Sequence, residues 1–251
     1  MQVELFIPCF IDQVKPSIAF DMIKVLEKAG CNVLYNVEQT CCGQPAYSAG
    51  YMADAREVAE KFVQEFPLGD PDRPTAKPIE KPIISPSASC VGMVKNHYNS
   101  IFQNTSLHNQ CRKVQKNMFE LSDFLVNQLQ KTDLECRFDA KVTYHDSCSA
   151  LRELRIKDAP RVLLNNIKGL QLIEMQDTET CCGFGGTFSF KYEPLSVSMG
   201  QQKVEHALAT GAEYIVSTDY SCLMHLDAYI KKNNLNIQVL HLAELLAKGI
   251  R

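Results

Sequence analysis

The chain has 251 residues, of which 45% are hydrophobic and 22% charged, and its formal net charge is −3. A chain of this size and composition buries a substantial core and is neither disordered nor collagen-like. No basic stripe and no apolar run near the ~20 residues of a membrane span are present, so we expect neither a nucleic-acid partner nor an integral membrane protein.

In the first half, hydrophobic periodicity and Gly/Pro punctuation predict alternating strands and helices. The expected elements are a strand at 2–7, a helix at 17–28 that stops near Gly30, a strand at 31–35, a helix at 52–66, a strand at 82–85 and a helix after Cys90. The stretch 67–82 contains five prolines, which exclude helix and central strand. We expect it to be an exposed inserted loop.

The second half repeats the order. We expect a strand at 140–144, a helix at 159–167 that stops before Gly169, strands at 170–175 and 213–217, a helix at 196–210 between them, and a helix after Cys222. Alternating strands and helices predict an α/β fold: two tandem pseudo-repeated units, each with a mostly parallel sheet flanked by helices.

The cysteines carry the same repeat. Each half has one cysteine, then Cys-Cys-Gly after 31 or 32 residues, then another cysteine after 47 or 39 more. The flanking sequences match too, because 83–90 aligns with 215–222 and 119–125 with 240–246. We therefore predict a tandem duplication, with a first cysteine-rich repeat over 1–136 and a second over 137–251. The repeated cysteines are Cys9, Cys41, Cys42 and Cys90 in the first half, and Cys148, Cys181, Cys182 and Cys222 in the second.

These eight thiols point to a metal or redox function. Residues 1–8 lack the features of a secretory signal, so a cytoplasmic location is expected, where thiols stay reduced. Each repeated cysteine follows a predicted strand, and in a parallel sheet such positions meet at one edge. Four thiolates bind an iron-sulfur cluster or zinc, and adjacent cysteines fit several irons better than one tetrahedral ion. Buried thiols without a metal are the remaining alternative for the eight. Cys31, Cys111 and Cys136 are expected to bind no metal and to be core or surface filler.

Residues around the second Cys-Cys-Gly suggest further roles. The glycines of 183–186 would point backbone amides at inorganic sulfur. His145 and Asp146 precede Cys148. They either support the ligands or handle protons from beside the site, or His145 is an ordinary histidine at a strand end. Four aromatic residues follow and form either an exposed docking patch or part of the core: Phe184, Phe188, Phe190 and Tyr192.

The motifs 7–9, 144–148, 181–186 and 217–222 resemble those of the cysteine-rich domain proteins with tandem Cys-Cys-Gly motifs. This family includes proteins of the heterodisulfide reductase B type and the iron-sulfur subunits of glycolate and anaerobic glycerol-3-phosphate dehydrogenases. The stand-alone chain, which has no fused ferredoxin domain, is most similar to the lactate-utilisation branch. The resemblance covers nearly the whole sequence.

The resemblance implies a non-autonomous oxidoreductase subunit that carries electrons in a cytoplasmic complex oxidising L-lactate to pyruvate. Its partners would be a ferredoxin-like iron-sulfur subunit and a third small subunit. The family motif maps Cys9, Cys41, Cys42 and Cys90 to one site, and Cys148, Cys181, Cys182 and Cys222 to the other. One or two [4Fe-4S] clusters per chain are implied, with zinc an option in one motif, as in some relatives.

The sequence departs from the family pattern at one position in each half, and this departure bears on which cluster and which activity are expected. The full motif ends in Cys-x-x-Cys and gives five cysteines per site, whereas here Ser87 and Asp219 occupy the first position of that pair. Four ligands suit an ordinary [4Fe-4S] cluster. The alternatives are a disulfide reductase subunit of the heterodisulfide reductase B type and a zinc-stabilised scaffold subunit without redox activity.

Overall fold

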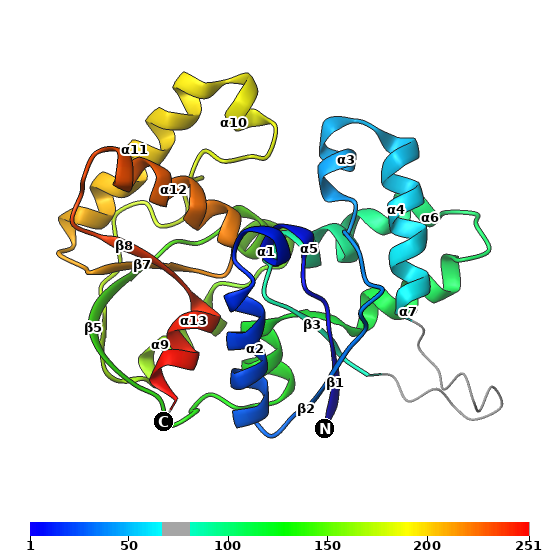
Figure 1. The fold of residues 1–251 in the computed structure, drawn as a ribbon, viewed down its shortest axis with the longest axis horizontal. Helices are drawn as coiled ribbons and strands as arrows, with labels where there is room; N and C mark the ends of the chain where they lie inside the picture. The colour runs from blue at the N-terminus through cyan, green and yellow to red at the C-terminus, as the bar shows by residue number, and fades with distance from the viewer. Residues whose placement is uncertain (67–80, 251) are drawn as a thin grey trace.

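Two four-stranded parallel sheets form the framework of the molecule (Figure 1). The computed structural model describes residues 1–66 and 81–250, so the expected proline-rich loop lies outside the described residues except at its end. The strand order is β2-β1-β3-β4 in the first sheet and β6-β5-β7-β8 in the second. Corresponding strands pair in the same way, with Leu5 beside Ile84 and Tyr144 beside Val216. The predicted α/β fold of two repeated units is confirmed.

The first sheet and its helices come from residues before 129. Its elements are β1 (Gln2–Leu5), α1 (Cys9–Val14), α2 (Ser17–Lys28), β2 (Asn32–Tyr35), α3 (Gln44–Ala49), α4 (Met52–Glu65), β3 (Ile83–Ser85), α5 (Ala88–Gly92), the π-helical turn η1 (Met93–His97), α6 (Tyr98–Phe102), α7 (His108–Asn117), β4 (Met118–Glu120), α8 (Leu121–Asp123) and η2 (Phe124–Gln128).

The second sheet comes from residues after 136. Its elements are β5 (Arg137–Tyr144), η3 (Ser149–Glu153), α9 (Asp158–Asn165), β6 (Lys168–Leu172), α10 (Phe188–Lys191), α11 (Glu193–Ala209), β7 (Tyr214–Ser217), α12 (Tyr220–Lys232), β8 (Gln238–His241) and α13 (Leu242–Gly249).

Helix α2 shows why the periodicity was informative. Its buried residues are Ile18, Met22, Val25 and Leu26, which occupy one face at helical spacing. The helix ends before Gly30, whose φ of +88° suits glycine and whose amide donates to the Glu27 carbonyl. The structure therefore places this helix at its predicted bounds.

Three local predictions need correction. Cys90 and Cys222 lie inside the first turns of α5 and α12, not ahead of them. Strand β6 ends at Leu172, short of Met175, and begins before Gly169, which has a φ of +83° beside a shift in register between β5 and β6. Strands β4 and β8 were not expected, because runs of three and four residues are too short for period-two alternation to reveal.

One hydrophobic cluster is built from both halves, whereas two further clusters take their buried residues from the first half and from the second half. Helix α2 of the first half packs on α13 of the second, and α9 of the second packs on α8 and η2 of the first. This reciprocal packing buries a cluster that includes Leu26, Phe124, Leu163 and Leu245 from both halves. The Lys24 ammonium also donates across the junction to the Ala247 carbonyl at 2.7 Å. Among the described residues, no helix has the length and apolarity needed to cross a membrane.

Candidate metal centres

The repeated cysteines gather at the carboxyl ends of the parallel strands. In the order β2-β1-β3-β4, all strands are parallel, but β2 is added on one side of β1 and β3 on the other. Open α/β sheets form their ligand crevice at such a switch in strand order, here between β1 and β3. Cys9 follows β1 and opens α1, Cys41 and Cys42 follow β2, and Cys90 follows β3. The second half repeats this arrangement around β5 and β7.

In the first set, the four thiols form a row of neighbours. The Cys9 and Cys41 sulfurs are 3.4 Å apart, Cys41 is in hydrogen-bonding range of Cys42, and Cys42 of Cys90. The row runs from exposed Cys9 to buried Cys42 and Cys90. One end of the set is thus open to solvent and the other lies in the core.

The second set has the same order. Cys148 contacts Cys181, Cys181 contacts Cys182, and Cys182 contacts Cys222. Cys148 is exposed, whereas Cys182 and Cys222 are buried. The structure therefore brings together each predicted group of four, although the cysteines of a group are up to 81 residues apart in the sequence (9 to 90).

In each set, one thiol is held ready to ionise. Hydrogen bonds from Cys42 and then Cys9 lower the pKa of Cys41, and those from Cys148 and then Cys182 lower the pKa of Cys181. The Gly43 amide donates to the Cys41 sulfur at 3.3 Å, and the Gly183 amide to Cys181 at 3.4 Å. Thiolates are the form that binds metal, so the lowered pKa of this sulfur favours metal binding in each set.

The glycine after each pair is required by the backbone. Gly43 has a φ of +81° and Gly183 a φ of +95°. A Cβ at Gly183 would lie 2.5 Å from the Ser196 carbonyl oxygen, and one at Gly43 3.1 Å from that of Ala55. Glycine therefore allows α4 and α11 to approach the Cys-Cys turns.

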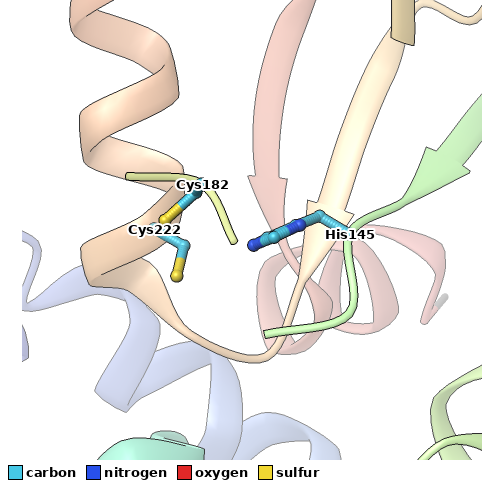
Figure 2. Close-up of side chains that lie close together, drawn as sticks. All are labelled: His145, Cys182 and Cys222. Atoms are coloured by element: carbon cyan, nitrogen blue, oxygen red, sulfur yellow. The ribbon is translucent and has the colours of Figure 1, made fainter. Parts of the chain in front are cut away.

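His145 belongs to the second set. Its side chain is fully buried, and neither ring nitrogen has a hydrogen-bond partner among the described residues. A ring nitrogen and the sulfurs of Cys182 and Cys222 lie within 4.8 Å of one another, and Figure 2 shows the ring pointing toward both thiols. Burial first, and then the charge of Lys203, lowers the pKa of His145 to about 3, so the ring is neutral and offers a lone pair.

Asp146, the other half of the predicted pair, faces a different environment. Its carboxylate forms a two-pronged ion pair with Arg161 at 2.7 and 2.8 Å, and Arg161 also pairs with Glu174. The Arg161 guanidinium lies over the Tyr144 ring. Asp146 therefore anchors the start of the Cys148 loop through Arg161.

Ser87 and Asp219 meet each other across the two halves. The Ser87 hydroxyl donates to Asp219 at 3.5 Å, and Asp219 also accepts from the Ser89 amide and hydroxyl, both at 3.0 Å. Burial raises the pKa of Asp219 to about 6. The two positions that lack the fifth cysteine thus form a polar link between the halves.

Lys203 was not anticipated from the sequence. It is 1% exposed, and its ammonium donates to the carbonyls of Asp177 and Thr178, in the segment that leads to Cys181. The sequence does contain a signal for its burial, because Lys203 falls at helical spacing on the buried face of α11. The other residues of that face are Ser196, Gly200, Val204 and Ala207.

The remaining predicted residues divide by exposure. Cys31, Cys111 and Cys136 are buried in hydrophobic clusters, so of the two expected places, core and surface, they occupy the core. Of the aromatic residues after the second pair, Phe190 is 86% and Tyr192 58% exposed, while Phe184 and Phe188 are half-buried. The Phe184 ring lies 6.1 Å from that of Phe10, so only part of the predicted patch faces solvent.

The donor sets fit a thiolate-bound metal group. Each set presents four sulfurs, a glycine amide beside them and one open end, which suits an iron-sulfur cluster or zinc. The buried imidazole without a partner adds a nitrogen donor to the second set alone.

Comparison with known proteins identifies relatives along the whole chain. The model of the CCG cysteine-rich domain matches residues 3–95 and 142–227. "Lactate utilization protein A" of Exiguobacterium sp. is 38% identical over 99% of this chain and 98% of its own length. "Lactate utilization protein A 2" of Bacillus cereus is 36% identical over 100% and 99%. A crystal structure of a hypothetical protein from Helicobacter pylori shares the fold, with a TM-score of 0.62 and 16% identity; this chain spans 49% of that one.

Proposed function

The chain belongs to the CCG cysteine-rich domain family, and we propose that it is an iron-sulfur electron-transfer subunit of a cytoplasmic complex that oxidises L-lactate to pyruvate. The link to lactate comes from relatives named for lactate utilization that match this chain over its full length. The observation that carries the electron-transfer role is the pair of matching thiol rows at the strand ends, each with an exposed terminal cysteine.

All eight repeated cysteines are assigned as cluster ligands in this proposal. Cys9, Cys41, Cys42 and Cys90 would hold one [4Fe-4S] cluster, and Cys148, Cys181, Cys182 and Cys222 another. A cluster bound there supplies one-electron redox chemistry. The chain itself holds the glycine amides at the sulfurs, a contact that tunes the reduction potential, and excludes water from the buried cysteines.

A ferredoxin-like subunit and a third small subunit are the proposed partners. The exposed rings of Phe190 and Tyr192, in and just after α10, would give such a subunit an apolar contact. In Figure 1 the helix pairs α3–α4 and α10–α11 lie on either side of α1 and α5.

A zinc-bound scaffold is the second candidate for the second half. The compact set of His145, Cys182 and Cys222, with ligand atoms within 4.8 Å, suits a single tetrahedral ion. Disulfide reduction has less support, since Ser87 and Asp219 are engaged in the link between the halves where a fifth thiol would be needed.

Metal analysis of protein purified without oxygen tests the proposal. We expect about eight irons and eight sulfides per chain and an electron paramagnetic resonance signal on reduction. The matched variants Cys42→Ser and Cys182→Ser should each lose about half of the iron and sulfide. Zinc without sulfide would overturn the electron-transfer role, and loss of all iron from either variant would overturn the independence of the two sites.

A further inference from the structure

The two metal centres differ at one buried position beneath the thiols. The Phe6 amide donates to the Ile84 carbonyl, and the His145 amide donates to the Val216 carbonyl, at the same point of each sheet. Phe6 is therefore the counterpart of His145, and each is the first residue after its strand, β1 or β5. The repeat places an apolar ring in the first half and an imidazole in the second.

The helix that packs beneath the thiols also differs between the halves, with a more polar buried face in the second half than in the first. The buried stripe of α4 is Ala55, Ala59, Phe62, Val63, and that of α11 is Ser196, Gly200, Lys203, Val204. The alignment of Ala55 with Ser196 is fixed by their carbonyls, which approach the glycines of the two Cys-Cys-Gly turns. Phe62 is thus the counterpart of Lys203.

In the first half, Phe6 and Phe62 pack edge to face, with ring centroids 4.8 Å apart. Such a pair fills the space below the thiols and leaves no polar atom. In the second half, the same two positions hold an imidazole and an ammonium. Burying these polar groups costs free energy unless they find partners.

Lys203 has partners, because it donates to two backbone carbonyls. His145 has none among the described residues, although both of its ring nitrogens are buried. The ring points at Cys182 and Cys222 (Figure 2), and the three ligand atoms lie within 4.8 Å of one another. A metal ion held by these two sulfurs would complete the bonding of the imidazole.

We propose that His145 is a ligand of the metal group in the second half, so that this centre has mixed sulfur and nitrogen ligation while the first centre has sulfur ligation only. The proposal rests on the assignment of Cys182 and Cys222 as ligands, because these two lie with His145 in the compact set. A [4Fe-4S] cluster has one ligand position on each of its four irons, so in such a cluster His145 would take the position assigned above to Cys148 or Cys181. It makes the two centres chemically different, and an imidazole ligand in place of thiolate raises the reduction potential of an iron-sulfur centre.

The test uses the full-length Cys41→Ser, Cys42→Ser variant, in which the first site is disabled. This protein is labelled with ¹⁵N-histidine, reconstituted with ferrous iron and sulfide without oxygen, and reduced. Pulsed electron paramagnetic resonance should show a directly bound nitrogen whose coupling differs between ¹⁴N and ¹⁵N samples. The same protein carrying His145→Gln as well should lose this coupling and retain metal more weakly, by at least the roughly 10–100-fold that the loss of a residue supporting a ligand costs.

His225→Gln is the matched control, because the His225 ring packs against the same turn near Gly183 but is not in the three-residue set. The control should keep the coupling. Absence of any histidine coupling, or its persistence in His145→Gln, would overturn the assignment. Even if His145→Gln fails to fold, the labelled protein that keeps His145 shows whether any histidine nitrogen is bound to the metal.

Failure of the electron-transfer role is distinguishable from failure of this proposal. Zinc without sulfide would overturn that role only. Cobalt(II) would then replace the zinc, and a ¹⁵N-sensitive coupling lost in His145→Gln would support the ligand assignment. Cobalt(II) without such a coupling would overturn it.

Discussion

At the residue scale, one helix cap near the end of each repeat shows that equivalent positions can hold an acid in one half and a base in the other. Glu120 caps α8 by accepting from the amides of Ser122 and Asp123, and its counterpart His241 caps α13 by accepting from the Ala243 amide. Burial raises the pKa of Glu120 to about 7, and burial lowers the pKa of His241 to about 4. Both caps therefore favour their neutral form in the folded protein.

The Glu120 cap predicts a pH dependence of stability. The folded state binds a proton on Glu120 up to about pH 7, whereas the unfolded state releases it near 4.5. This side chain therefore lowers the free energy of unfolding as pH rises from 4.5 to 7, by about 3 kcal/mol in all, and its effect is constant above pH 7. Buried histidines give the opposite slope, so the difference between variant and parent is the quantity to measure.

We expect Glu120→Gln to become progressively more stable than the parent across this range, because the amide keeps an acceptor for the cap and never ionises. Urea unfolding of the metal-free protein at pH 5, 6, 7 and 8 measures the difference. Glu57→Gln, at an exposed position of α4, is the matched control for the substitution itself. Parallel curves for Glu120→Gln and the parent would contradict the assigned pKa.

At the scale of elements, α4 and α11 occupy equivalent places in the two repeats but stabilise their surroundings by different contacts. Both place a buried stripe beneath a Cys-Cys-Gly turn, and both need the glycine for close approach. Helix α4 stabilises its turn through the aromatic cluster of Phe6, Phe62 and Phe66. Helix α11 instead stabilises the segment before Cys181 through the ammonium of Lys203.

Lys203→Met tests this role of α11. Methionine fills much of the same volume but removes the charged donor that Lys203 gives to the carbonyls of Asp177 and Thr178, which keep only their other donors from Thr180 and Asp146. We therefore expect a loss of roughly 1–3 kcal/mol in the free energy of unfolding, the range for a hydrogen bond to a charged group. Denaturant unfolding of the metal-free protein measures it. Lys191→Met, at an exposed position of α10, should leave stability nearly unchanged. Equal effects of the two substitutions would show that the carbonyl contacts contribute little.

At the scale of the whole molecule, the repeats are halves of one folding unit. Helices α2 and α13 pack against each other from opposite halves, and their side chains belong to one buried cluster. Asp219 adds hydrogen bonds to Ser89 across the junction. The two repeats in one chain therefore pack against each other much as the two subunits of a symmetric dimer do.

This packing predicts the behaviour of the separated repeats 1–136 and 137–251. Each alone would expose the face that α2 or α13 normally covers, so we expect neither to unfold cooperatively by itself. Produced together, they should associate one to one and regain the circular dichroism spectrum of the intact chain. A cooperative transition in either isolated repeat would show that the halves are independent domains.

The sequence determined the repeat, the α/β class and the two groups of four cysteines, because duplicated spacings and hydrophobic periodicity are local, one-dimensional signals. It also placed α2 and α4 closely, since their amphipathic stripes are long enough to read. It did not reveal the short edge strands, or that the cysteines after β3 and β7 lie within a helical turn.

Only the tertiary structure decided which side chains lie beside the thiols. Sequence proximity joined His145 to Cys148 and Asp146, but the ring faces Cys182 and Cys222, while Asp146 pairs with Arg161. Lys203 and the contact between Ser87 and Asp219 involve residues distant in the chain. The physical reason is that a strand end fixes where the backbone arrives, whereas the neighbours of a buried side chain depend on the packing of elements from elsewhere in the sequence.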